Sequence, residues 1–210
     1  MLTRSLSGRF VSRDEHLYKT LYLVYLVYFI CVIEYARHIQ ARIKMSSRKN
    51  SVVKLNAGIL TACMLGLGLS YYAYFVETAK EEDDSYEAMC DISERVSCTK
   101  AFASVYGKGF GIIPESSILY APNPVYGLIA YTLIAVLGIL DNYTASFLNI
   151  IVGILANICS VYLAYVLYLL NDICIICVSN YVVNAIILIL VVKKHRRLFQ
   201  NEASRKKKTH

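Results

Sequence analysis

Four long runs of apolar residues dominate the pattern of the chain. They cover residues 55–76, 124–140, 143–170 and 172–192. Each run is longer than an ordinary strand and lacks alternation of period two, so the pattern predicts helices. About 20 apolar residues span a bilayer as a helix, in which every backbone amide bonds within its own segment. The sequence therefore predicts an all-α polytopic membrane protein, a bundle of four transmembrane helices.

A fifth candidate helix covers residues 17–36. It is rich in tyrosine, and tyrosine favours the interface between membrane and water. The segment could span the membrane or lie in its interface plane. A secretory signal peptide is a further interpretation, but no small-residue cleavage site precedes the basic segment that follows.

Charge orients the four predicted helices. The net charge of +7 is concentrated in two segments, with six basic residues in 37–54 and eight in 193–208. Residues 77–122 hold nine of the fifteen acids and four basic residues. Short basic segments stay in the cytosol. We expect both basic segments there and a lumenal loop over residues 77–123. Nucleic-acid binding is not expected, because no basic patch has a folded domain of its own.

The last residues of the chain resemble a localisation signal. Lys207 and Lys208 stand fourth and third from the end, as in a dilysine signal for retrieval to the endoplasmic reticulum. The alternative is a solvated basic tail. With a cytosolic C-terminus the signal is favoured, and we expect a multi-pass protein of the endoplasmic reticulum membrane.

Two of the seven cysteines open the last predicted helix, in Cys174-Ile175-Ile176-Cys177. Cysteines at this spacing can close a small disulfide. We expect Asn171 or Asp172 to cap the helix and so to place Cys174 in its first turn. The free amides there favour a thiolate, which makes one thiol a nucleophile.

A second pair, Cys90 and Cys98, lies in the predicted lumenal loop with seven residues between. We expect both to be accessible to water. A loop pair together with a pair at the membrane edge is the arrangement that an electron relay by thiol–disulfide exchange requires. Two purely structural disulfides are an alternative. A zinc site is another, but these spacings are poor for zinc and no metal site is predicted.

The other three cysteines and a glycine-rich segment have simpler interpretations. Cys31, Cys63 and Cys159 lie inside apolar runs and are expected to be inert core residues. Residues 107–111 read Gly-Lys-Gly-Phe-Gly, but no strand precedes them and no dinucleotide-binding unit follows. We expect a loop that passes close over the helix bundle.

These motifs together resemble the vitamin K epoxide reductase family. The likeness rests on Cys90-Asp91, Ser97-Cys98, Phe102-Ala103-Ser104, Gly107 to Gly111, Ser160 to Ala164, Asp172 to Cys177 and Tyr181. It covers roughly residues 50–197. The two cysteine pairs in register with the glycine loop are more specific than a lone C-x-x-C.

The resemblance implies a fold and a division of the chain. The family fold is a four-helix membrane bundle with a lumenal loop that caps the substrate pocket. We expect this domain at residues 45–197. Residues 1–44 have no counterpart and form an N-terminal extension. Residues 198–210 are the basic cytosolic tail.

The resemblance also implies roles for the four paired cysteines. Cys177 would contact the quinone or epoxide, and Cys174 would be its disulfide partner. Cys98 would pass electrons to Cys174. Cys90 would receive them from a thioredoxin-like lumenal protein.

Four further residues match the pocket of the family. Asn123 and Tyr181 would bond to substrate oxygens, and the tyrosine is implicated in binding coumarin anticoagulants. Phe102 and Tyr126 would be aromatic walls. Tyr126 replaces a usual phenylalanine and Tyr106 a usual tryptophan, which puts anticoagulant affinity in question.

The implied reaction is the reduction of vitamin K 2,3-epoxide to the quinone and hydroquinone. Redox-active disulfides would serve it, with no bound cofactor. Because exchange is reversible, the same residues could serve a quinone-linked oxidase that forms disulfides. A non-catalytic membrane scaffold is the alternative from another class.

Overall fold

The computed structural model describes residues 50–93 and 95–208. The tyrosine-rich segment 17–36, the extension 1–44 and Cys31 lie outside the described residues. Side chains are described through residue 201.

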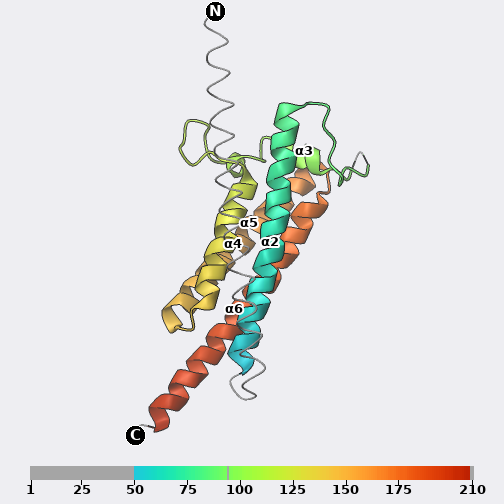
Figure 1. The fold of residues 1–210 in the computed structure, drawn as a ribbon. Helices are drawn as coiled ribbons and strands as arrows, with labels where there is room; N and C mark the ends of the chain where they lie inside the picture. The colour runs from blue at the N-terminus through green and yellow to red at the C-terminus, as the bar shows by residue number, and fades with distance from the viewer. Residues whose placement is uncertain (1–49, 94, 209–210) are drawn as a thin grey trace, which may run out of the picture. The chain divides into compact units, whose positions relative to one another are not determined.

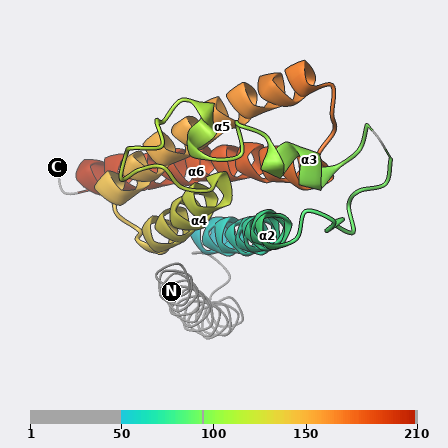
Figure 2. The same cartoon turned by 90° about the horizontal axis from the view of Figure 1, so that it is seen from above.

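Four long helices form the bundle (Figure 1). They are α2 (Asn50–Glu82), α4 (Asn123–Ile139), α5 (Tyr143–Leu170) and α6 (Ile175–Lys208). Seen from above, α2 and α4 lie on one side and α5 and α6 on the other (Figure 2). No strand is found in the described part of the chain. The predicted all-α bundle of four helices is confirmed.

Three of these helices are long and apolar enough to cross a membrane. Within the described residues they are Ser51–Glu82, Tyr143–Leu170 and Ile175–Asn201. The apolar helix α4 is shorter, with 17 residues. That length lies at the lower limit for crossing a bilayer.

The predicted bounds hold for α5 and fail for α6. The last helix begins three residues after the predicted 172 and continues through Lys208 instead of ending at 192. Residues 193–208 contain neither glycine nor proline, and most are good helix formers, so nothing stops the helix where the apolar run ends. The predicted domain boundary between 197 and 198 therefore falls inside α6.

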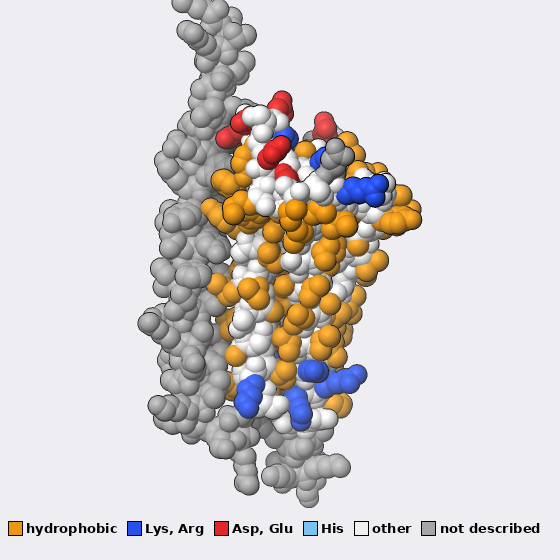
Figure 3. Space-filling view, turned by 90° about the vertical axis from the view of Figure 1, so that its right-hand side faces the viewer, with side chains coloured by type: hydrophobic (Ala, Val, Ile, Leu, Met, Phe, Trp, Pro, Cys, Tyr) orange, Lys and Arg blue, Asp and Glu red, His pale blue; other side chains and the backbone are white. Residues whose placement is uncertain are grey.

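The predicted capping loop is present, but α2 takes its first six residues. The remaining segment, from 83 to 122, lies at one end of the bundle, which we call the loop end (Figure 1). It contains α3 (Cys98–Ala103) and a 3-10 turn, η1 (Gly109–Gly111). Acidic side chains gather at this end and a band of hydrophobic side chains follows (Figure 3).

Asp91 organises the first half of the loop. Its carboxylate accepts hydrogen bonds from Ser97 Oγ at 2.8 Å, the Thr99 amide at 3.1 Å and the Ala88 amide at 2.8 Å. The Thr99 hydroxyl also donates to it. Burial opposes ionisation of this carboxyl, but the hydrogen bonds outweigh burial and lower the pKa of Asp91 to about 2. The ionised side chain therefore holds residues 88–99 together.

The glycine-rich segment passes close over the bundle, as expected, since its Phe110 carbonyl accepts a hydrogen bond from Tyr162 of α5. A Cβ atom on Gly107 would lie 2.0 Å from the Phe102 carbonyl oxygen, so only glycine fits. Gly109 and Gly111 have positive φ angles of 55° and 70°. These backbone conformations favour glycine and allow the tight turn.

A buried lysine joins the helices at the opposite end, where residues 140–142 link α4 to α5. Lys194 is 1% exposed and donates to the Gly138 oxygen at 2.7 Å and the Leu140 oxygen at 3.0 Å. Its ammonium also lies 3.1 Å from Asp141, which accepts a hydrogen bond from Asn56 at 2.9 Å. This group ties α2, the end of α4 and α6 together.

Replacing Lys194 should destabilise the bundle. Lys194→Met leaves the carbonyl groups of Gly138, in α4, and of Leu140, just after it, without their donor, so the free energy of unfolding should fall by about 2 kcal/mol. Denaturant titration of the purified protein in detergent measures this. Lys193→Met, at the exposed neighbouring position, is the matched control and should change stability by less than about 0.5 kcal/mol. Equal stability of the two variants would contradict the assignment.

The order of the loop should depend on the ionisation of Asp91. Because the pKa of Asp91 is lowered in the folded protein, its stabilising effect is present above about pH 4 and is lost as pH falls toward about 2. Hydrogen-exchange protection of the Ala88 and Thr99 amides, corrected for intrinsic rates, should fall over that range. In Asp91→Asn the protection should already be low at neutral pH. Protection that is unchanged in this variant would refute the role of the carboxylate.

Candidate functional site

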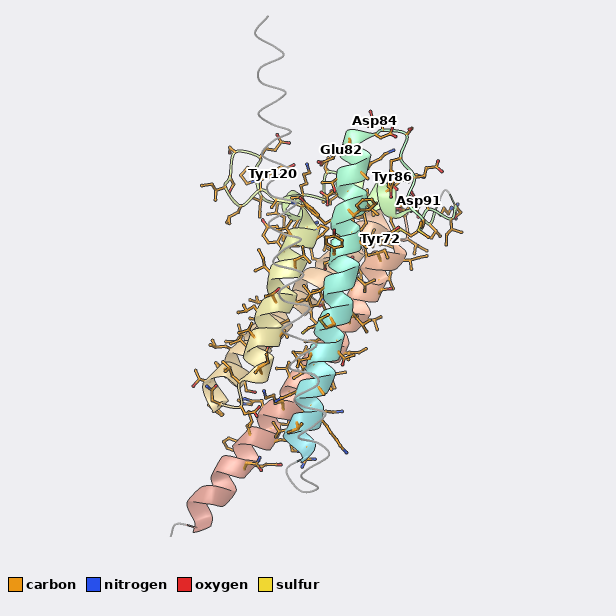
Figure 4. The ribbon with its side chains drawn as sticks, viewed as in Figure 1. Tyr72, Glu82, Asp84, Tyr86, Asp91 and Tyr120 are labelled. Atoms are coloured by element: carbon orange, nitrogen blue, oxygen red, sulfur yellow. A yellow bond between two sulfur atoms is a disulfide. The ribbon has the colours of Figure 1, made fainter. Side chains whose placement is uncertain are left out.

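Two disulfides lie in one hydrophobic cluster at the loop end. Cys90 is bonded to Cys98 with 5.8 Å between their Cα atoms, and Cys174 is bonded to Cys177 with 5.2 Å. Buried residues of α2, the loop, α3 and α5 surround them: Ala73, Val76, Ala88, Ala101, Phe102 and Leu167. Tyr72 and Tyr86 pack against this cluster from α2 and from the loop (Figure 4).

The start of α6 differs from the prediction. Cys174 precedes the first helical residue, Ile175, and its sulfur accepts a hydrogen bond from the Cys177 amide at 3.1 Å. Asn171 instead ends α5 in a left-handed conformation, with φ of 56°. The prediction that Asn171 or Asp172 caps α6 is wrong, because the chain must turn between two antiparallel helices and these residues serve the turn. One helix amide, that of Cys177, still faces the sulfur of Cys174.

Two hydrogen bonds clamp the loop onto this turn. The Ile173 amide donates to the Arg95 carbonyl at 2.9 Å, and the Ser97 amide donates to Asp172 Oδ1 at 3.2 Å. Ser97 immediately precedes Cys98, and Ile173 immediately precedes Cys174. The clamp therefore brings together the backbone positions that present one cysteine of each pair.

The loop cysteines are buried, so the prediction that both are accessible to water is wrong. Cys98 and Cys174 are 0% exposed, and Cys90 is at the limit of burial. The hydrophobic cluster covers them because the clamp and the Asp91 hydrogen bonds fold the loop inward. Met89, next to Cys90, is 93% exposed. Of the loop pair, Cys90 thus lies nearer the surface.

An apolar cavity of about 490 Å³ adjoins the Cys174–Cys177 disulfide, which we call the inner disulfide. All four long helices contribute to it, as do α3 and the glycine loop. Its walls include the predicted residues Cys177, Asn123, Tyr181, Phe102 and Tyr126, together with Tyr106. Cys174, Cys90 and Cys98 are not among its lining residues.

Asn123 holds the glycine loop over the cavity. Its Nδ2 donates to the Tyr106 carbonyl at 2.6 Å, and its Oδ1 accepts from the Phe110 amide at 2.9 Å. Tyr162 of α5 donates to the Phe110 carbonyl at 3.0 Å. The rings of Phe110 and Tyr126 pack with centroids 5.1 Å apart. Both polar atoms of the Asn123 amide are thus bonded to the loop.

A charge pair attaches the same loop to α2. Lys108 forms an ion pair with Glu81, and both side chains are partly exposed. Burial lowers the pKa of Lys108, but the hydrogen bond and the charge of Glu81 outweigh burial and raise it above its ordinary value. The charged pair is therefore favoured at neutral pH.

Four polar residues that line the cavity were not predicted as site residues from the sequence. Tyr131 donates to Asn180 Oδ1 at 3.1 Å, and Asn184 donates to Ser160 Oγ at 2.8 Å. All four line the cavity. Their signal in the sequence was available, since Asn180 and Asn184 follow Cys177 by three and seven residues in an apolar run and so share its helix face.

The two free cysteines of the described residues behave differently. Cys63 is buried, as expected. Cys159 is exposed and lines the cavity, so the prediction of a core position is wrong. It lies on α5 where the helix faces the cavity.

Comparison with known proteins agrees with this geometry. The sequence model of the vitamin K epoxide reductase family matches residues 58–192. Vitamin K epoxide reductase complex subunit 1 of Mus musculus is 35% identical over 140 residues, which cover 64% of this chain and 87% of the mouse protein. The protein of the same name from Rattus norvegicus is 36% identical over the same shares. The chain therefore belongs to the vitamin K epoxide reductase family and is a membrane thiol oxidoreductase of that type.

Proposed function

We propose that this protein reduces vitamin K 2,3-epoxide to the quinone and the hydroquinone. The observation that carries the proposal is the packing of two disulfides in one cluster, with the inner one at the wall of an apolar cavity. The relatives named for vitamin K epoxide reductase support the same substrate.

Electrons would enter through Cys90. A thiolate of a thioredoxin-like lumenal protein attacks the sulfur of Cys90 and releases Cys98 as a thiolate. The second thiol of the donor then resolves the mixed disulfide, so the donor is oxidised and the loop pair is reduced. The position of Cys90 nearer the surface supports this order.

The clamp would keep Cys98 close to Cys174 for the next electron transfer. The Cys98 thiolate attacks Cys174 and releases Cys177, and Cys90 then attacks Cys98 to free Cys174. Two electrons have moved from the loop pair to the inner pair, and the loop disulfide is restored. The sulfur of Cys174 accepts a hydrogen bond from the Cys177 amide, which would stabilise the thiolate as it is released.

Cys177 would react with the substrate in the cavity. Reduction of the epoxide uses two electrons and two protons, forms the Cys174–Cys177 disulfide and releases the epoxide oxygen as water. Reduction of the quinone consumes the same number of electrons and protons and gives the hydroquinone. Tyr181 and the remaining N–H of Asn123 are suited to bond the ring oxygens, with Phe102 and Tyr126 flanking the ring.

The cavity suits a substrate that dissolves in lipid. Its walls are mainly apolar, and Ile129, Leu133 and Leu155 line it from α4 and α5 while staying exposed. We expect a quinone to enter between these helices from the bilayer. Coumarin anticoagulants would occupy the same cavity, with Tyr106 and Tyr126 modifying their affinity.

The charge distribution supports a location in the endoplasmic reticulum membrane. Basic side chains lie at the end opposite the acidic loop (Figure 3). This arrangement favours a lumenal loop and a cytosolic C-terminus. The dilysine sequence at positions 207 and 208 would then face the cytosol.

A dithiol-driven assay of the purified protein tests the reaction. Vitamin K epoxide, vitamin K quinone and a ubiquinone analogue are offered separately. We expect turnover of the first two, and a loss of more than about a thousandfold in Cys177→Ala and Cys174→Ala, since each removes half of the reacting pair.

Cys63→Ala is the matched control, because this buried cysteine belongs to neither disulfide, and it should keep its activity. Turnover of the ubiquinone analogue alone would favour the quinone-linked oxidase. No turnover with any of the three would refute the proposal, as would activity that survives Cys177→Ala.

A further inference from the structure

The Tyr131–Asn180 pair places a free hydrogen-bond donor beside the reacting cysteine. Tyr131 Oη donates to Asn180 Oδ1 at 3.1 Å, and both side chains line the cavity. The bond engages the oxygen of the amide and leaves its nitrogen. Among the described residues, no hydrogen bond is found for Asn180 Nδ2. Two N–H groups are therefore available to a molecule in the cavity.

Asn180 stands within reach of a ring that reacts at Cys177. Asn180 follows Cys177 by three positions, a spacing that places them on one face of α6, about 4.5 Å apart along the helix axis. A quinone whose reacting carbon faces Cys177 would thus carry an oxygen past the Asn180 amide. Donors that meet an oxygen where negative charge develops lower the barrier to its reduction.

The packing of Tyr131 fixes the orientation of this amide. Tyr131 is 3% exposed, and a Cβ atom on Gly66 of α2 would lie 2.5 Å from its ring. The ring therefore fills space that the glycine leaves open. Because the tyrosine is held by α2 and α4, its hydroxyl holds the Asn180 side chain of α6 in one orientation.

The contrast with Asn123 sharpens the assignment. Both polar atoms of the Asn123 amide are bonded to the glycine loop, which leaves one N–H. Asn180 keeps two. A polar side chain at membrane depth is costly to retain, so an amide with two unused donors in a cavity indicates a ligand.

From these contacts we propose that Asn180, oriented by Tyr131, donates a hydrogen bond to a ring oxygen of the quinone. The inference rests on the proposed function and assigns a further substrate-positioning residue to the same cavity. Asn180 binds the substrate directly, while Tyr131 acts through Asn180.

Binding to the oxidised protein tests the proposal without turnover. The probes are a 2-methyl-1,4-naphthoquinone with a short isoprenoid tail and the same molecule with hydrogens in place of both oxygens. In Asn180→Ala, the Kd of the quinone should rise roughly five- to tenfold, as expected for one lost hydrogen bond. The Kd of the hydrocarbon should change less than about twofold, because it offers no acceptor.

Two further variants separate positioning from packing. Tyr131→Phe should weaken quinone binding in the same selective way but by a smaller factor, because the amide remains and only its orientation is released. It also keeps the test decisive if Asn180→Ala folds poorly. Asn157→Ala is the matched control, since Asn157 bonds the Gly153 and Asn184 carbonyls and does not line the cavity. It should leave both constants unchanged.

The outcomes distinguish this inference from the proposed function. An equal loss for both probes, or no loss for either, would overturn the role of Asn180 even if the wild-type protein reduces vitamin K epoxide. Selective loss of quinone binding in a protein without turnover would support the role of Asn180 and refute the reaction instead.

Discussion

Two hydrogen bonds between the loop and the turn before α6 are the interaction on which the rest of the site depends. They join Arg95 to Ile173 and Ser97 to Asp172, and Ser97 and Ile173 each stand one residue before a cysteine, Cys98 and Cys174. Thiol–disulfide exchange requires contact between sulfurs, so a loop that moved freely would rarely transfer electrons. The clamp instead holds the loop next to the turn that carries Cys174.

The surrounding structure supports this clamp from both sides. Asp91 folds residues 88–99 into a compact unit, and the Lys108–Glu81 pair attaches the glycine loop to α2. At the far end, Lys194 fixes the end of α4 against α6. The bundle can therefore keep an open cavity beside Cys177 because polar contacts secure its two ends. The apolar cavity thus meets the Cys174–Cys177 disulfide at Cys177, and the second disulfide lies in the same hydrophobic cluster.

The sequence predicted the parts of this structure that depend on local pattern. Apolar runs predicted four helices and the bounds of α5, because a membrane helix must satisfy its own backbone. Prediction from the sequence failed where tertiary contacts determine the structure. The burial of Cys98 depends on the clamp, and the N-terminal position of Cys174 depends on the use of Asn171 in the turn. The length of α6 beyond residue 192 follows from helix propensity in a segment where hydropathy gives no signal. The spacing to Cys177 was enough to place Asn180 on the cavity face of α6, but its hydrogen bond with Tyr131 could not be predicted, because Tyr131 lies 49 residues away.

The most direct measurement is the trapping of one mixed disulfide. Cys90→Ser combined with Cys177→Ser leaves Cys98 and Cys174 as the two cysteines that the clamp brings together. After mild oxidation, peptide mapping under non-reducing conditions should find these two joined in most molecules. The reciprocal variant, which keeps Cys90 and Cys177, should yield much less crosslink. Failure to join positions 98 and 174, or equal yields from both variants, would contradict the electron route described here.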